Sequence, residues 1–254
     1  MTEPDAGSDV AAIKTFARKD GDAYVLNGSK TYITNGHRRI ISPFGPHQRR
    51  SGYHSFSLFV VPTDLPGLHV SKKLDKMGMR SSDTAELYFD GMRIPAQNLI
   101  GIEGEGFIHQ MMQFQHERFA VLPLTYISAK DIIDETVEYL KGRVVFGKPL
   151  IKKQVLRHRL VEWLSEIECL KQLTYHIVRM KMAGQDVSKE ISMGKLVGGG
   201  LLSRVTDGCL QMYGGLGFMN EMWVSRAYRD ARLLSIGGGA SEVMSDVIAK
   251  LEGY

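Results

Sequence analysis

The sequence contains little cysteine and no long hydrophobic run. Its only cysteines are Cys169 and Cys209, too few for a disulfide scaffold and without the spacing of a zinc site. No HExxH motif is present, so we expect no metal site. No apolar stretch approaches the roughly 18 residues that span a bilayer, which argues against a membrane protein. Both cysteines fall in segments with helical patterning, where we expect buried, reduced thiols.

A strong excess of charge of one sign is also missing. Lys and Arg number 32 against 28 Asp and Glu, a net charge of +4 that is too weak to indicate a nucleic-acid-binding surface. The basic residues of 37–39 and 49–50 are separated by prolines and lack an aromatic stacking pattern, so we interpret them as a solvated loop. With 43% apolar and 24% charged residues, the composition is that of a globular protein with a sizeable core.

Residues 1–102 are predicted to form a β domain. Two segments have the pattern of hairpins, with the turn signals Asn-Gly at 27–28 and Asp-Gly at 90–91 between apolar stretches. Residues 56–61 form a short apolar run that suits a buried strand. Because little helical patterning separates these strands, we expect a small antiparallel sandwich or barrel.

Residues 103–254 are predicted to be helical. Apolar residues recur every three or four positions between 156 and 180 and again between 191 and 212. The glycines at 198–200 interrupt the second stripe, and we expect them to weaken that helix by about 1 kcal/mol each. Pro123 is expected to kink its helix. Short connections predict an antiparallel four-helix bundle, and the whole chain is therefore predicted to be α+β.

The glycine clusters do not have the context of nucleotide-binding loops. Those at 101–106 and 214–217 do not follow a strand of a βαβ unit, and no lysine follows 237–239 as a P-loop would require. Turns and helix caps explain them equally well.

Five sequence blocks follow one another along nearly the whole chain. They are TEPDAGSD at 2–9, LNGSKTYITNG at 26–36, KMGMRSSDT at 76–84 with RIP at 93–95, RVVFGKPL at 143–150 with Gln154, and QMYGGLG at 211–217 with YRDAR at 228–232. Each block alone is a weak signal. Together, in this order and at this spacing, they resemble the motifs of the acyl-CoA dehydrogenase family.

The resemblance implies a fold with an N-terminal helical domain, a middle β domain and a C-terminal four-helix domain. The chain begins inside the first block, so we expect it to carry the last two domains without the first. Its first residues have neither a signal-peptide nor a transit-peptide pattern. The family's usual location implies the mitochondrial matrix, with the cytoplasm as the alternative.

The resemblance also implies FAD-dependent oxidation of an acyl-CoA thioester to the trans-2-enoyl-CoA. In that reaction a carboxylate removes the α-proton, the hydride passes to flavin N5, and the electrons continue to an electron-transferring flavoprotein. Many members carry the base where this chain has Gly238. The isovaleryl- and long-chain-type members carry it in an ERL-like motif, which residues 117–119 match. Glu117 is therefore the predicted base, against the alternative of an ordinary surface glutamate.

The remaining site residues carry over from the family position by position. The implied FAD contacts are Met1, Thr2, Ser8, Tyr32, Thr34, Arg143, Phe146, Gln154, Gln211, Gly214, Gly215, Ala240 and Glu242. Those from Arg143 to Gly215 would reach the FAD of a neighbouring subunit, which implies a homo-oligomer, a dimer or a tetramer. The implied substrate contacts are Ser8, Ser82, Gln115, His116, Arg118, Gly238 and Gly239.

Departures from the family pattern leave two alternatives open. Ala240 replaces a threonine whose hydroxyl meets the flavin, a loss of about 1 kcal/mol. Residues 37–55, which include Pro43 and Pro46, are not expected to form the strand that the family has there. One alternative is a truncated, inactive member that acts as a binding or assembly partner. The other is a flavin monooxygenase or acyl-CoA oxidase on the same fold.

Overall fold

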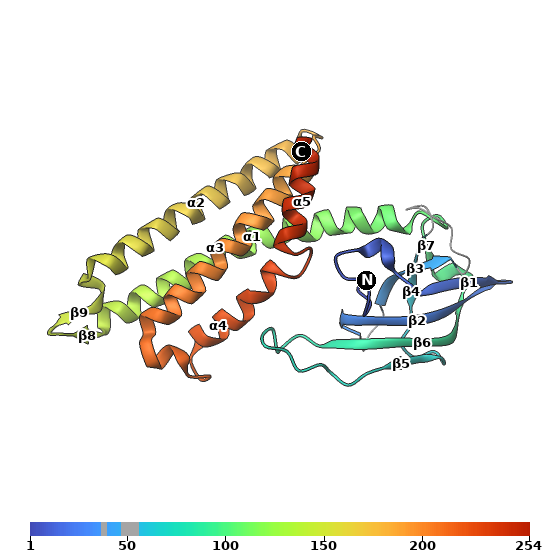
Figure 1. Cartoon of the computed structure of the whole chain (residues 1–254), viewed down its shortest axis with the longest axis horizontal. Coiled ribbons are helices and arrows are strands. Elements are labelled where there is room, and N and C mark those ends of the chain that lie inside the picture. The colour runs from blue at the N-terminus through green and yellow to red at the C-terminus, as the bar shows by residue number, and fades with distance from the viewer. Residues whose placement is uncertain (37–39, 47–55) are drawn as a thin grey trace. The chain divides into compact units, whose positions relative to one another are not determined.

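The computed structural model describes residues 1–36, 40–46 and 56–254 (Figure 1). The chain forms two compact units, residues 1–114 and 115–254. The first unit is a curled β-sheet and the second is a set of packed helices, so the α+β prediction is confirmed. Within the described residues no helix combines the length and the hydropathy needed to cross a bilayer.

The sheet of the first unit is mixed, and its strand order is β5-β6-β2-β1-β3-β4-β7. All its strand pairs are antiparallel except β1 with β3, which is parallel. Its core is a cluster of buried apolar side chains from β2, β3, β4 and β6. The strands are β1 (Phe16–Asp20), β2 (Ala23–Thr34), β3 (Ile40–Pro46), β4 (Ser57–Val61), β5 (Leu68–Val70), β6 (Thr84–Pro95) and β7 (Leu99–Ile100).

The two predicted hairpins are wrong, because β2 and β6 are each a single long strand. The Asn-Gly and Asp-Gly signals lie opposite one another where β2 pairs with β6. There Leu26 pairs with Met92 and Gly28 with Phe89. One residue of β2 therefore faces two of β6, and Gly91 has a φ of +59°, as in a G1-type bulge. An Asn-Gly or Asp-Gly pair favours positive φ, which a bulge needs as much as a turn does.

The expectation that prolines prevent a strand at 40–46 is also wrong. The Gly45 N–H donates to the Thr15 carbonyl at 2.8 Å, so the nitrogen of Gly45 faces β1. Because backbone directions alternate along a strand, the nitrogen of Pro43, two residues earlier, faces the same side. The β1 ladder begins only at Gly45, so the missing N–H of Pro43 costs no hydrogen bond. Pro46 is the last residue of β3, beyond the β4 ladder. The basic residues of 37–39 and 49–50 lie outside the described residues.

The helices confirm both predicted apolar stripes. The buried side chains of α2 include Leu160, Trp163 and Ile167, and those of α3 include Ile191 and Val205. The helices and the small hairpin of the second half are α1 (Gly106–Gly142), β8 (Val144–Val145), β9 (Lys148–Pro149), α2 (Gln154–Met182), α3 (Ser188–Tyr213), α4 (Trp223–Ala231) and α5 (Ser241–Glu252). As expected Cys209 is buried, but Cys169 is exposed because it lies beside the buried stripe of α2.

The glycines of α3 allow close packing rather than interrupting the helix, which is continuous. A Cβ at Gly194 would lie 2.9 Å from Leu122, and one at Gly198 would lie 3.2 Å from Thr125, both on α1. A Cβ at Gly208 would lie 2.2 Å from the ring of Trp163 on α2. At these positions glycine lowers the intrinsic helix propensity of α3 but allows α3 to pack closely against α1 and α2. α1 likewise continues through Pro123 as one helix.

Substitution of Gly208 by alanine is therefore expected to destabilise the protein by about 1–3 kcal/mol, the usual cost of overpacking a core. Gly200 is a matched control, because its Cβ would meet only the mobile end of Arg204 at 3.3 Å. Gly200→Ala should be neutral or stabilising by up to about 1 kcal/mol. Urea denaturation of both variants checks this, and equal stability of the two would contradict the packing role of Gly208.

Candidate functional site

The residue that follows the predicted base contacts a turn that leads into α5. Glu117 is exposed on α1, and the next residue, Arg118, is partly buried. Arg118 donates from Nε to the carbonyl oxygen of Gly238 at 2.8 Å. Burial lowers the pKa of the Arg118 guanidinium, and the charge of Glu117 acts in the opposite direction. The structure therefore brings Arg118, the neighbour of Glu117 in the sequence, into contact with Gly238.

Lys195 on α3 is a second cation at this turn, and sequence analysis missed it. Its side chain is buried, with the residue 3% exposed, and its ammonium donates to the carbonyl of Gly239. Burial and the nearby charge of Arg118 lower the pKa of Lys195 to about 8, whereas Glu242 opposes this shift. One signal could have revealed it: Lys195 lies four residues after Ile191, on the apolar stripe of α3, where a lysine is unusual.

The turn itself depends on glycine. Gly238 and Gly239 have φ values of +67° and +108°, a region that non-glycine residues rarely adopt. A Cβ at Gly239 would also lie 2.7 Å from Met244 and 3.1 Å from Arg118, whereas one at Gly238 would meet nothing within 4 Å. Gly238 thus borders open space. Ala240 is the N-cap residue of α5 and provides no side-chain cap, and Glu242 is exposed in the first turn of that helix, where a negative charge is favoured.

Two other predicted substrate contacts precede Glu117 on α1. His116 is exposed and Gln115 is partly buried. The side-chain oxygen of Gln115 is buried without a hydrogen-bond partner among the residues that the structure describes. An unsatisfied buried acceptor is costly, so this oxygen is available to a ligand donor.

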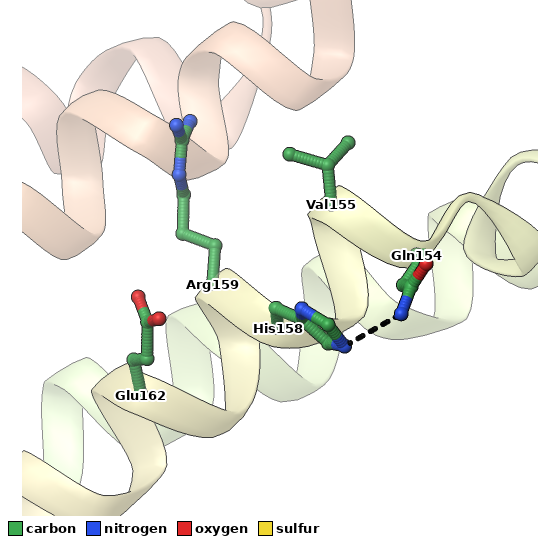
Figure 2. A pocket seen from close by; sticks show the side chains of 5 residues that line it. All are labelled: Gln154, Val155, His158, Arg159 and Glu162. Carbon is green, nitrogen blue, oxygen red and sulfur yellow. Dashed lines mark hydrogen bonds between the residues drawn. The ribbon is translucent and has the colours of Figure 1, made fainter.

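A second group of predicted cofactor residues lies where α1 leads through the β8–β9 hairpin into α2. Phe146 is 90% exposed at the tip of the hairpin, with φ of +51° and the ammonium of Lys153 5.5 Å from its ring centre. Arg143 is exposed, and Gln154 begins α2. A shallow pocket opens along this part of α2, where Gln154 and His158 approach to 3.3 Å between side-chain nitrogens (Figure 2). The other residues that line it are Val155, Arg159 and Glu162.

Gln211, Gly214 and Gly215 lie at the same end of the helical unit. α3 follows α2 after a short connection and runs back beside it (Figure 1), so the end of α3 lies near the beginning of α2. A Cβ at Gly214 or Gly215 would meet nothing within 4 Å, which leaves their backbone accessible. Lys195 and Gln211 are sixteen residues apart on α3, about 24 Å along its axis. The structure therefore separates this group from the Glu117 group.

The predicted contacts of the first unit gather around β2. The N-terminal segment binds to this strand, since the Thr31 N–H donates to the Thr2 carbonyl at 2.9 Å. Tyr32 is 69% exposed with φ of +58°, at an irregularity between Lys30 and Ile33. Thr34 and Ser8 are exposed, whereas Met1, Thr2 and Ser82 are partly buried.

A buried ion pair anchors the N-terminal segment, and sequence analysis did not assign it a role. The ammonium of Lys30 lies 2.9 Å from the Glu3 carboxylate and 2.9 Å from the Thr15 hydroxyl. Both side chains of the pair are almost completely buried, at 0% and 4% exposure. Glu3 also accepts hydrogen bonds from the Thr15 hydroxyl and from the Lys14 backbone N–H. The pair therefore fixes the segment that carries Met1, Thr2 and Ser8.

The exposed groups have the chemistry that FAD requires. Tyr32 and Phe146 present aromatic faces for a ring system, and the guanidinium of Arg143 suits a pyrophosphate. The open backbone at Gly214 and Gly215 permits the close approach of a ligand. No cluster of His, Cys, Asp or Glu that could hold a metal is found in the part of the chain that the structure describes.

Two family models match the chain. The acyl-CoA dehydrogenase middle-domain model covers residues 1–92 and the C-terminal-domain model covers residues 104–252. The mitochondrial long-chain specific acyl-CoA dehydrogenase of Sus scrofa is 36% identical over 253 residues, which are 98% of this chain and 59% of that protein. The short-chain specific enzyme of Megasphaera elsdenii is 37% identical over 245 residues, 96% of this chain and 64% of that protein.

Solved structures give the same result. The acyl-CoA dehydrogenase of Geobacillus kaustophilus superposes with a TM-score of 0.96 at 38% identity, covering 100% of this chain and 68% of that one. The butyryl-CoA dehydrogenase of Megasphaera elsdenii has a TM-score of 0.93 at 35% identity, with coverage of 99% and 66%. The chain thus spans about three fifths to two thirds of the length of these relatives. With two family models matched in order and relatives above 30% identity along its whole length, the chain belongs to the acyl-CoA dehydrogenase family.

Proposed function

We propose that the chain carries the catalytic site of an FAD-dependent acyl-CoA dehydrogenase, in which Glu117 is the base. One contact supports this most directly: Arg118, the neighbour of Glu117, binds the carbonyl of Gly238 at 2.8 Å. This hydrogen bond ties the candidate base on α1 to a glycine turn whose backbone borders open space. A base and a set of backbone donors held together are what α-proton removal next to a thioester requires.

In the proposed reaction the carboxylate of Glu117 takes the proton from the α-carbon of the acyl thioester. The backbone N–H of Gly238 donates to the thioester oxygen, where negative charge develops as the proton leaves. Bound FAD supplies the hydride acceptor for the β-carbon, so that the product is the trans-2-enoyl-CoA. Ser82, Gln115 and His116 are further proposed contacts of the CoA thioester.

The cofactor contacts point to a homo-oligomer. Met1, Thr2, Ser8, Tyr32 and Thr34 would hold the flavin end, and Ala240 and Glu242 are further proposed flavin contacts. The Arg143 and Gln211 groups lie at the end of the helical unit away from Glu117, so they would hold FAD bound to another subunit of a dimer or tetramer.

The onward electron acceptor and the compartment are further parts of the proposal. A structural neighbour, at 34% identity and a TM-score of 0.93, is described with the electron transferring flavoprotein of Acidaminococcus fermentans. We propose such a flavoprotein as the electron acceptor. Both mitochondrial and bacterial relatives match the chain, and we propose the mitochondrial matrix as its location, with the cytoplasm as the alternative.

A second candidate function is that of an inactive binding or assembly partner. The exposure of Glu117 favours it, because water around a carboxylate opposes the rise in basicity that a dry site provides. The two candidates differ in whether acyl-CoA reduces the bound flavin.

An anaerobic titration with acyl-CoA thioesters of increasing chain length separates these functions. The purified chain, loaded with FAD, is expected to lose its visible flavin absorption with one class of thioester, which would also identify the substrate. A flavin that stays oxidised with every thioester would favour the inactive partner. Rapid re-oxidation by oxygen, without an electron-transferring flavoprotein, would instead indicate an oxidase.

A further inference from the structure

The surroundings of Lys195 are unusual for a buried lysine. Its ammonium forms no ion pair within 4.0 Å among the described residues, although burying a lone charge is expensive. The acceptor that it does have is the backbone carbonyl of Gly239. Arg118 makes the matching contact with the carbonyl of Gly238. Two cations from two helices therefore hold two consecutive carbonyls of one turn.

Peptide geometry determines what these contacts do to the turn. A trans peptide is planar, so a contact that holds its C=O fixes the whole peptide. Since Arg118 holds the Gly238 carbonyl and Lys195 holds the Gly239 carbonyl, two consecutive peptide planes are fixed, and with them the backbone at Gly238. The Gly238 N–H donates no backbone hydrogen bond among the described residues.

We propose that Lys195 is a positioning residue that, together with Arg118, holds the carbonyls of Gly238 and Gly239 and so fixes the turn that presents the Gly238 N–H to the thioester oxygen. This inference rests on the proposed function and adds a residue to it. Lys195 would thus stabilise the charge of the transition state without touching the substrate.

The glycines explain why the turn needs such contacts. Positive φ values at two consecutive glycines describe a backbone with many alternative conformations. The side chain that packs closest to this turn, Met244, is apolar and fixes only one side of Gly239. Hydrogen bonds from two charged groups select one orientation for each peptide plane.

The test uses a chromophoric arylacryloyl-CoA, an unreactive enoyl thioester whose absorption shifts to the red when its carbonyl is polarised. The FAD-loaded wild-type chain is expected to bind it with a red shift. Lys195→Met should lose most of that shift and about 10- to 100-fold in kcat, less than the loss of a direct oxyanion donor, with KM changed much less. Lys195→Arg, which keeps the charge, should retain most of the shift.

A surface lysine of the same helix provides the matched control. Lys189 is partly exposed and pairs with Glu252 at 3.3 Å. It lies six residues before Lys195, about 9 Å away along α3, so Lys189→Met should bind the probe as the wild type does. A red shift that persists in folded Lys195→Met would overturn the role of Lys195 alone. A wild-type chain that does not bind the probe, or binds it without a red shift, would overturn the proposed carbonyl site and the role of Lys195 with it.

The wild-type chain offers a second measurement that needs no substitution. The charged groups that face Lys195 are Arg118 from α1 and Glu242 from α5. Lys195 itself, with its pKa lowered to about 8, loses its charge between pH 7 and 9. The red shift should therefore decrease as the pH rises through about 8, and the same decrease in Lys195→Met would contradict the assignment.

Discussion

The Glu117→Gln variant is expected to bind FAD normally and to lose about 10²- to 10⁴-fold in the rate of flavin reduction by acyl-CoA, the usual contribution of a general base. Glutamine keeps the size and shape of the side chain but does not accept the α-proton. Because Glu117 is exposed, the substitution should not change the stability of the protein. Anaerobic rapid mixing, followed at the flavin band, measures the rate directly.

Two other glutamates make this experiment specific. Glu138 is exposed further along α1 and pairs with Lys141 at 2.6 Å, so Glu138→Gln controls for loss of a helix-surface charge and should reduce flavin at the wild-type rate. Glu242 is the other carboxylate near the turn. A wild-type rate in Glu117→Gln together with a large loss in Glu242→Gln would move the base to Glu242 and reject the present assignment.

The Lys30→Met variant is expected to lose about 3–5 kcal/mol of unfolding free energy, because removal of one partner leaves the other charge buried and unpaired. Burial alone would raise the pKa of Glu3, but the charge of Lys30 and the hydrogen bonds from Thr15 and Lys14 hold this pKa below its usual value. Loss of Lys30 removes the strongest of these opposing effects. Urea denaturation of the whole chain measures the change.

The same variant should weaken FAD binding, because the ion pair fixes the segment that carries Met1, Thr2 and Ser8. Lys14 provides the control in the same segment: its 2.7 Å ion pair with Asp5 is exposed, so Lys14→Met should cost less than about 1 kcal/mol. The double variant Lys30→Met with Glu3→Gln should lose less than the sum of the two single changes. Additive losses would show that the two charges do not stabilise one another.

The acid stability of the protein should follow from the same pair. A carboxylate whose folded pKa is lowered contributes stability above its unfolded pKa, about 4.3, and that contribution is lost as the pH falls through the folded value. Wild-type stability should therefore decrease below about pH 4.5, and more steeply than that of Glu3→Gln.

Local sequence determined the features that depend on neighbouring residues. The three-four spacing in 156–180 and 191–212 predicted α2 and α3, since the apolar side of a helix must face a core. The five ordered blocks identified the family, and with it Glu117 as the candidate base. The sequence also predicted positive φ at Gly28 and Gly91. It could not predict whether these glycines form a turn or a bulge, because both need the same backbone conformation.

Only the tertiary structure decided which distant residues meet. Lys30 reaches Glu3 across 27 positions, Arg118 reaches Gly238 across 120, and Lys195 reaches Gly239 across 44. None of these pairs has a local pattern, because a hydrogen bond between separate elements depends on how the strands and helices pack. The sequence alone therefore identified the candidate base and the turn, whereas the buried cations that hold the turn and the N-terminal segment in place required the fold.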